Sequence, residues 1–329
     1  MKRDTVYFRQ AELLLRVLPF INEEEIFALK GGTEINFFFR DLPRLSVDID
    51  LTYLPINDRK TALTDIEKAL IRITERMKKA IAGVRVFSKK DREFNLVAGL
   101  LVRRGDATIK VEPNSVMRGS VFPTETRVLC QKAQDLFELS IEARTLSFED
   151  LYGGKACAAL DRQHPRDLFD IDMLLKKEGL PEKVRKAFIV YLVSHSRPMI
   201  EILNPHWSAP RPVFEREFQG MMIQSVTAEE LRIVGERLVS TLHEEMTWEE
   251  MRFIVSIKEG KIPVGNAGSA RNREPSCRSM EASKHTPNDA NETPRATAKT
   301  PELPWCIERL DKFTSYSVKP YRRCVGELN

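Results

Sequence analysis

The hydrophobic pattern of residues 1–145 predicts a strand–helix–strand start, then a helical crossover and more strands. Residues 5–18 and 59–82 repeat apolar positions at helical spacing, and Pro19 is expected to end the first of these helices. Residues 33–39 also have a helical pattern. The expected strands are residues 26–29, 46–51, 84–87, 94–102 and 107–111. This order predicts an α+β fold, a small mixed sheet with helices on one side.

From about residue 146 the pattern becomes helical. The expected helices are residues 147–161, 166–177, 182–194, 211–222, 227–243 and 247–258, and four prolines at positions 198, 205, 210 and 212 predict a loop among them. Residues 262–304 hold almost no large apolar side chains, so they cannot bury enough surface to offset the entropy of ordering. We therefore expect a sheet domain over residues 1–145, a helical domain over residues 146–260 and a disordered or divergent tail over residues 261–329.

Charge and cysteine content narrow the choice of partners and compartment. The formal charge of +4 arises in residues 261–329, which hold 12 lysines and arginines against 8 acidic residues. Residues 1–260 are therefore balanced, and nucleic-acid binding there would need a local basic patch. Five cysteines without C-x-x-C spacing fit a reduced, cytoplasmic setting better than disulfides or a zinc site. The start, MKRDTVYFRQ, has no apolar run after its basic residues, so no signal peptide is expected. No apolar stretch approaches 18 residues, so no membrane partner is expected either.

Two aspartates, Asp48 and Asp50, lie two residues apart in an expected strand. Because strand side chains alternate, both carboxylates point to one face, where they repel each other. A hard divalent cation removes that cost, and Mg²⁺ prefers a few carboxylates plus substrate phosphates. Upstream, Gly31 and Gly32 allow a phosphate to approach the backbone, and a helix beginning at Thr33 favours an anion. The alternative is two solvated aspartates on a half-exposed strand, but the upstream Gly-Gly element favours a site.

A third carboxylate and a distant polar segment extend this candidate site. Glu112 is either a further ligand or an exposed strand end. Lys155 and Arg162 are seven residues apart, so they share a helix face, and a lysine can neutralise phosphate charge. Asp167 and Asp170 follow Pro165 in a first helical turn, where capping is the alternative role for either. A solvated charged face is the alternative for Lys155.

Two segments resemble the AbiEii/AbiGii toxin family of nucleotidyltransferases, part of the DNA polymerase β-like superfamily. The superfamily signature is Gly-Gly or Gly-Ser followed by a D-x-D strand, and it resembles the segment LKGGTEINFFFRDLPRLSVDIDLTYLP. The later family motifs place a lysine on a helix, an arginine further along it and then R-D-L-x-D, as in SFEDLYGGKACAALDRQHPRDLFDI. Two motifs in this order are far more specific than either alone. The similarity covers about residues 5–260.

The resemblance implies roles for individual residues. Asp48 and Asp50 would be catalytic and hold Mg²⁺, with Mn²⁺ as the alternative ion and Glu112 as a looser match to a third ligand. Lys155 would contact the phosphates, and either Asp167 or its rival Asp170 would be the second catalytic acid, acting as a base. The residues expected to bind the nucleotide are Gly31, Gly32, Thr33, Arg44, Ser46, Lys155 and Arg162.

The resemblance also implies an activity. The domain of residues 1–145 would be a nucleotidyltransferase that moves a nucleoside monophosphate from an NTP to RNA, such as tRNA, or to a protein. It would act as the toxin of a toxin–antitoxin or abortive-infection system, with a cognate antitoxin encoded nearby. The alternatives are a small-molecule nucleotidyltransferase of the antibiotic-modifying type and a catalytically inactive nucleotide-binding module. Family members continue past SIKEG into ordered helices, and the Pro/Ser/Thr-rich tail departs from that pattern.

Overall fold

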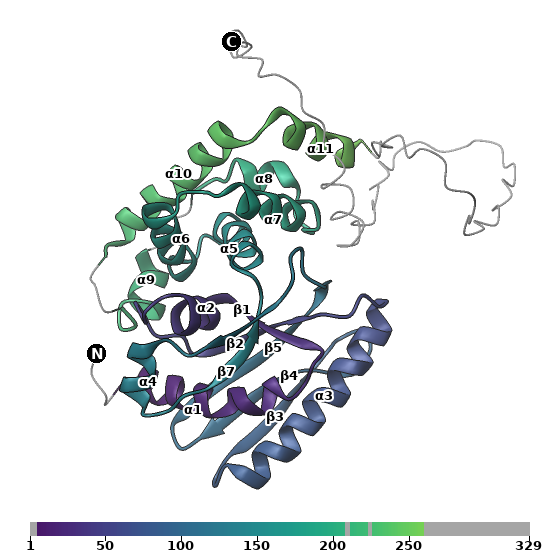
Figure 1. The fold of residues 1–329 in the computed structure, drawn as a ribbon, viewed down its shortest axis with the longest axis vertical. Coiled ribbons are helices and arrows are strands. Elements are labelled where there is room, and N and C mark those ends of the chain that lie inside the picture. Colours follow the sequence, from purple (N-terminus) through teal and green to yellow (C-terminus); the bar gives the residue numbers. More distant parts are fainter. Residues whose placement is uncertain (1–4, 208–210, 223–225, 260–329) are drawn as a thin grey trace, which may run out of the picture.

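The computed structural model describes residues 5–207, 211–222 and 226–259, so the expected tail of residues 261–329 lies outside the described residues. One sheet separates two groups of helices (Figure 1). The strands are β1 (Phe27–Lys30), β2 (Asp48–Tyr53), β3 (Arg85–Lys90), β4 (Val97–Arg104), β5 (Ala107–Arg118), β6 (Glu125–Val128) and β7 (Glu142–Thr145). The helices are α1 (Val6–Asn22), α2 (Gly31–Glu34), the π-helical turn η1 (Ile35–Phe39), α3 (Arg59–Ala80), α4 (Gln131–Phe137), α5 (Phe148–Arg162), α6 (Pro165–Lys177), α7 (Glu182–Val193), α8 (Met199–Leu203), α9 (Arg211–Glu217), α10 (Ala228–Glu245) and α11 (Trp248–Lys258).

The sheet is mixed, as the sequence predicts. Its seven strands lie in the order β3-β4-β5-β2-β1-β7-β6. The central strand β2 runs parallel to β5 and antiparallel to β1. Helices α1 and α3 pack on one face, where apolar side chains from β2, β4 and β5 form a core with them. The opposite face of β2 is therefore turned toward the later helices.

Two hydrophobic clusters share the described residues. One joins the sheet with α1, α3 and α4 over residues 11–143. The other joins the helices over residues 151–254 and takes in a single earlier residue, Ile35 of η1. We propose that these clusters correspond to the two expected domains, with the boundary near residue 145.

Several elements differ from their expected extents. Pro19 lies inside α1 instead of ending it. A proline removes one helical hydrogen bond, but Leu18 and Ile21 continue the face that the helix buries on the sheet, and that burial outweighs the loss. The helix expected from residue 33 begins at Gly31, and α9 covers only the first part of residues 211–222. Strands β6 and β7 and helices α4 and α8 were not expected.

Candidate active site

Strand β2 carries Asp48 and Asp50 on the face opposite the α1–α3 core. Ile49, between the two aspartates, and Leu51, after them, are fully buried on the core side. The two aspartates therefore share the other face, as the alternation predicts. Neighbouring strands place Lys30 of β1 and Glu112 of β5 in register with Asp50. The face that holds the aspartates is thus flanked by a cation on one side and an acid on the other.

The glycine turn after β1 fits closely around this face. Gly31 has a φ of 75°, a left-handed conformation that glycine adopts without strain. A Cβ atom at Gly31 would lie 2.7 Å from Oδ2 of Asp50. A Cβ atom at Gly32 would lie 2.7 Å from Nη2 of Arg44, so this glycine makes room for a buried arginine. Both glycines are therefore required by close approach of side chains from the following segment.

A cavity of about 260 Å³ lies between this face and the helices. Its walls bring together four of the predicted site residues, Gly31 and Asp50 from the sheet side and Lys155 and Arg162 from α5. More than 100 residues of chain separate the two pairs. The fold therefore joins the two sequence motifs in one polar pocket. Further lining residues that the sequence analysis left unassigned are Lys30, Asn114, Asp150, Asp161, Tyr191 and His195.

Lys30 is a site residue that the sequence analysis passed over. Burial lowers the pKa of its ammonium group, with further lowering from Lys155 and Arg162 and an opposing effect of Asp50. Among the described residues, no carboxylate forms an ion pair with Lys30. Its place at the end of β1, directly before the glycine turn, was the available signal. The charged lysine side chain adds a cation beside the paired aspartates.

The two aspartates of β2 lie in different surroundings. Burial raises the pKa of Asp50, Lys30 and Lys155 oppose that rise, and the nearby charge of Asp48 adds to it. Asp48 is more open, and its Oδ2 atom lies 3.5 Å from Nη1 of Arg166 on α6. Arg166 was not expected at the site. Its guanidinium partly compensates the carboxylate charge that a metal cation would otherwise balance.

Lys155 of α5 is buried, and its solvated-face alternative is therefore wrong. Its Nζ atom lies 2.8 Å from Oδ1 of Asp167 and 3.3 Å from Oδ2 of Asp170. Arg162 donates to Asp167 as well, with Nε 2.6 Å from Oδ2. The capping alternative for the two aspartates is also wrong, because His164 caps α6 by accepting from the backbone of Arg166.

Asp167 is held as an anion. Burial alone would raise the pKa of its carboxyl group, but Lys155 and Arg162 outweigh burial and hold that pKa well below its usual range. Both carboxylate oxygens accept hydrogen bonds from these cations. Asp167 does not line the cavity and both of its oxygens are occupied, so we propose that it anchors Lys155 and Arg162 in place of its expected role as a base.

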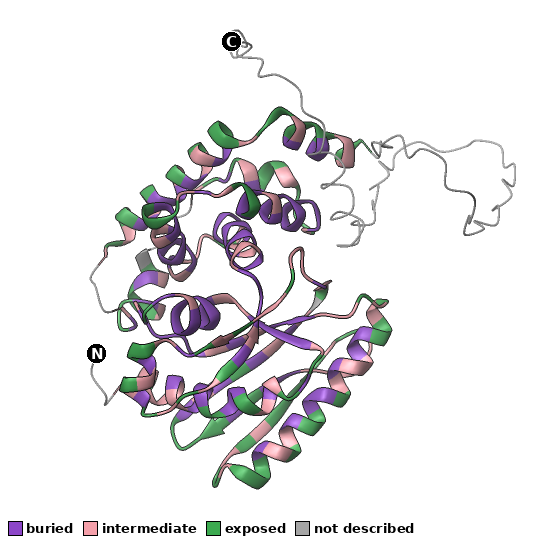
Figure 2. Cartoon of the chain, viewed as in Figure 1, coloured by how far each residue is buried: buried purple, intermediate pink, exposed green. Residues whose placement is uncertain are grey.

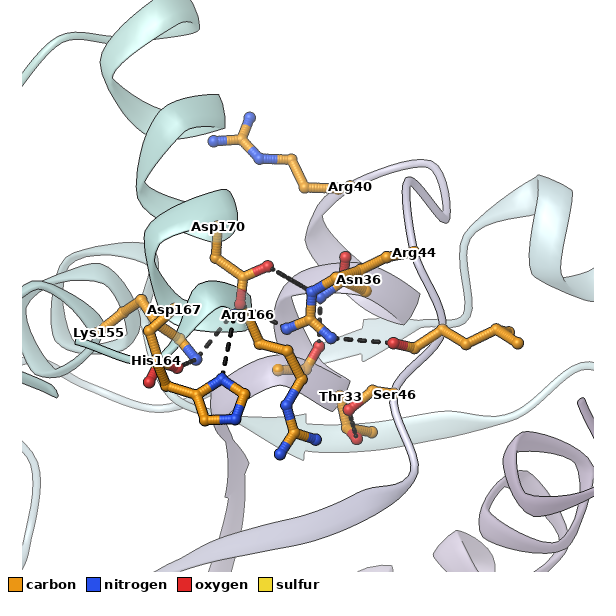
Figure 3. Close-up of polar contacts among 12 residues, drawn as sticks. Thr33, Asn36, Arg40, Arg44, Ser46, Lys155, His164, Arg166, Asp167 and Asp170 are labelled. Carbon is orange, nitrogen blue, oxygen red and sulfur yellow. Dashed lines mark hydrogen bonds and ion pairs between the residues drawn. The ribbon is translucent and has the colours of Figure 1, made fainter. Parts of the chain in front are cut away.

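Asp170 is fully buried, does not line the cavity and points toward Arg44 (Figure 3), so we propose a structural role for it in place of its expected rival role as catalytic acid. It accepts two hydrogen bonds from Arg44, with Nε at 2.9 Å and Nη2 at 2.6 Å, and a longer one from Asn36. Arg44 is 1% exposed, so it holds α6 against the turn and does not face the cavity. Its expected contact with the nucleotide is therefore replaced by a structural one.

Thr33 and Ser46 are also buried, contrary to their expected role in holding the nucleotide. The Thr33 hydroxyl donates to the backbone oxygen of Asp48 at 2.6 Å and lies 2.9 Å from the hydroxyl of Ser46. Neither residue lines the cavity. These side chains fix the start of β2 against α2, which sets the position of the first aspartate.

Glu112 shares the face of Asp50, but its side chain turns away toward β3. Its Oε1 atom lies 2.9 Å from Nζ of Lys89. Over the part of the chain that the structure describes, no three acidic, histidine or cysteine side chains come close enough together to ligate one ion. The candidate ligands are thus Asp48 and Asp50. Two carboxylates completed by substrate phosphates suit Mg²⁺, so the residues present fit this ion.

Comparison with known proteins places the chain in a family. The family model of the nucleotidyl transferase AbiEii toxin, from type IV toxin–antitoxin systems, matches residues 12–250. A solved structure of MenT4, a nucleotidyltransferase toxin of Mycobacterium tuberculosis H37Rv, resembles this fold with a TM-score of 0.57. The two share 14% sequence identity, over 78% of this chain and 92% of that one. A search of curated proteins finds no match.

None of the helices among the described residues has the length and apolar content to cross a membrane.

The match to the family model spans both predicted motifs and most of the described chain, and the structural likeness extends to a nucleotidyltransferase toxin. The chain therefore belongs to the AbiEii family of nucleotidyltransferase toxins of type IV toxin–antitoxin systems.

Proposed function

We propose that this enzyme moves a nucleoside monophosphate from an NTP to a hydroxyl group of an RNA acceptor, with Mg²⁺ held by Asp48 and Asp50. The observation that carries the proposal is the cavity that brings Asp50 and Gly31 opposite Lys155 and Arg162. A triphosphate is strongly anionic, and this cavity offers it two cations from α5 and a third from Lys30. Asp50 stands on the opposing wall and Asp48 shares its face of β2, so these two carboxylates would hold the cation and it would neutralise phosphate charge.

The chain's own residues supply binding and orientation. Asp167 and Asp170 hold Lys155 in place, so its ammonium group is fixed before substrate arrives. Arg162 is restrained in the same way by Asp167. Positioning and charge neutralisation account for most of the catalysis of phosphoryl transfer, so prearranged cations lower the cost of reaching the transition state. Bound Mg²⁺ would add further neutralisation of phosphate charge.

The family membership supports our choice of acceptor and regulatory partner. The resemblance of the two sequence motifs implies tRNA as acceptor for some related toxins and a cognate antitoxin as partner. We take RNA as the acceptor for this chain and keep protein as the competing result. Small-molecule transfer and loss of catalysis are the remaining alternatives, and the ion-paired Lys155 in the same cavity as Asp50 favours a working enzyme over the latter.

Label transfer tests this proposal directly. Each of the four α-labelled NTPs is incubated with Mg²⁺, total tRNA and the full chain, and the products are separated into RNA, protein and small molecules. Label in RNA from one NTP, abolished by EDTA and by Asp50→Ala, is the expected result. Asp106→Ala is the matched control, because Asp106 is exposed on the turn between β4 and β5. Label only in protein, only in small molecules or in no fraction would overturn the RNA proposal.

A further inference from the structure

A row of side chains crosses four strands and ends at Asp48. The register places Asp48 of β2 beside Lys110 of β5, Lys110 beside Leu101 of β4, and Leu101 beside Phe87 of β3. Side chains in register on neighbouring strands point to the same face. The row therefore spans about 14 Å, three interstrand spacings, from the candidate metal carboxylate to the edge of the sheet.

This face of β3, β4 and β5 is open, whereas the other face is covered. Residues between those of the row, such as Leu100, Val102 and Val111, are buried in the core beneath α1 and α3. On the open face Phe87 is 52% exposed and Leu101 is 37% exposed. Figure 2 shows exposed positions along β3, in agreement with its burial pattern. An aromatic ring thus lies in solvent in the middle of a strand.

The same face carries unbalanced positive charge. The next row places Arg85 of β3 directly beside Arg103 of β4. Like charges at directly opposed cross-strand positions are destabilising. Over the described residues, no carboxylate pairs with Arg85, Arg103 or Lys110, whereas Lys89 is neutralised by Glu112. An anionic partner laid across these strands would relieve the repulsion.

We propose that the open face formed by Arg85, Phe87, Leu101, Arg103 and Lys110 binds the single-stranded end of the RNA acceptor and leads its terminal hydroxyl to Asp48. Unstacked bases pack on exposed aromatic rings, and cations follow the phosphates, which is how single strands are bound without sequence readout. The row continues without interruption into the proposed active site. The inference rests on the proposed function for its chemistry but concerns a separate surface.

Protection of the sheet edge and docking of a protein both fit this face less well than RNA. Edge strands carry lysines that block pairing with other chains, which accounts for Lys89 and Lys90 on β3. Edge protection does not account for Arg103 and Lys110, because β4 and β5 are inner strands. The centre of a protein–protein interface is a mostly apolar patch, whereas this face offers only two apolar side chains, Phe87 and Leu101, beside cations without carboxylate partners among the described residues.

Binding of a fluorescent single-stranded oligoribonucleotide tests the inference. Phe87→Ala should weaken binding about 10-fold through lost stacking, and Phe87→Trp should retain it. Arg85→Gln with Arg103→Gln should weaken binding and reduce the slope of log affinity against log salt by about 1.4, roughly 0.7 for each phosphate contact. The matched controls are Lys78→Gln with Lys79→Gln on α3, beneath the covered face, and Trp248→Ala, an exposed aromatic on α11. Both should bind RNA like the wild type.

The outcomes distinguish failure of the proposed RNA-binding face from failure of the proposed nucleotide transfer. NTP affinity of every variant should match the wild type, because the face lies outside the cavity. The double-arginine variant should unfold at the same temperature as the wild type or higher, since two like charges that repel each other are removed. Wild-type RNA affinity in the Phe87→Ala and double-arginine variants would overturn the inference, as would the absence of RNA binding by the wild type. Binding that depends on the face in a protein that transfers no nucleotide would leave the surface standing and refute the proposed function instead.

Discussion

Two pairs of aspartates with similar local spacing have opposite surroundings in this molecule. Asp48 and Asp50 lie on a strand, and the side chain of Asp48 is 28% exposed with one long contact to Arg166. Asp167 and Asp170 lie on a helix, are 2% and 0% exposed, and accept short hydrogen bonds from Lys155, Arg162 and Arg44. The carboxylates of the first pair keep lone pairs available for a ligand, whereas those of the second accept hydrogen bonds from protein cations.

This contrast shows how the sheet and the helices contribute differently to the site. The carboxylates of the helix pair are already engaged by protein cations, so they hold those cations firmly and offer fewer lone pairs to a ligand in the cavity. The helical region therefore supplies fixed positive charge, and the sheet supplies free negative charge. The cavity between them is where a metal-bound triphosphate would complete the balance.

Replacement of a sheet aspartate should have the largest effect on activity and little on stability. Asp50→Ala and Asp48→Ala should each lower label transfer at least about 1,000-fold, since metal stabilisation of phosphate charge is worth several kcal/mol. The melting temperature should change by only a few degrees, because neither carboxylate makes a short hydrogen bond to another side chain in the described residues. Label transfer measures the loss of activity, and thermal unfolding measures the change in melting temperature. Activity near that of the wild type would contradict the metal-site assignment.

Replacement of a helix aspartate should have its largest effect on stability, the opposite of a sheet aspartate. Asp170→Ala leaves the buried guanidinium of Arg44 without its carboxylate and should lower the free energy of unfolding by about 3–5 kcal/mol. Lys176→Ala is the control on the same helix, since its pair with Asp172 is exposed on the lysine side and is worth about 0.3–0.5 kcal/mol. Urea unfolding measures both. Equal stability losses in the two variants would contradict the contrast.

Lys155 of α5 both lines the cavity and pairs with the helix aspartates, so its replacement should give an intermediate result. Lys155→Met keeps much of the side-chain volume but removes the ammonium group from the cavity and from Asp167. We expect KM for the NTP to rise about 30-fold, or roughly 2 kcal/mol, and the protein to become less stable. Steady-state kinetics with the labelled NTP give the first value and urea unfolding the second. An unchanged KM with reduced stability would limit Lys155 to a structural role.

Glu34 offers a third situation, a buried carboxyl group that forms no ion pair with any described residue. It is fully buried, and neither oxygen has a hydrogen-bond partner within the part of the chain that the structure describes. Burial raises its pKa well above the ordinary value of 4.5. The folded protein then binds a proton that the unfolded chain releases, so stability falls as pH rises from about 4.5 toward the raised pKa. Glu34→Met should remove this fall and stabilise the protein by about 1–2 kcal/mol at pH 8.

Unfolding of both proteins from pH 4 to pH 8 measures this smallest effect. The difference between wild type and Glu34→Met should widen as pH rises and nearly vanish at the acidic end. A variant that is less stable at pH 8 than the wild type would show that Glu34 makes a favourable interaction as an anion.

The fold was predictable where a pattern is long. Helix α3 and strands β4 and β5 bury repeated apolar positions, which reveal their period over many residues. Strands β6 and β7 have four residues each, and α8 has five in a proline-rich stretch, too short for a period to stand out. The extent of α1 past Pro19 depended on burial against the sheet, which local propensity does not contain.

The site divides in the same way. Local sequence was enough to show which residues share a face, because alternation along β2 and helical spacing along α5 are local properties. Alternation places Asp48 and Asp50 on one face of β2. Helical spacing places Lys155 and Arg162 on one face of α5. Which charges meet depended on the three-dimensional fold. Arg44 finds Asp170 across 126 residues, and burial there converts both from expected site residues into a structural ion pair. Desolvation and Coulomb energy depend on three-dimensional distance, so aspartates are candidate ligands in one place and anchors for buried cations in another.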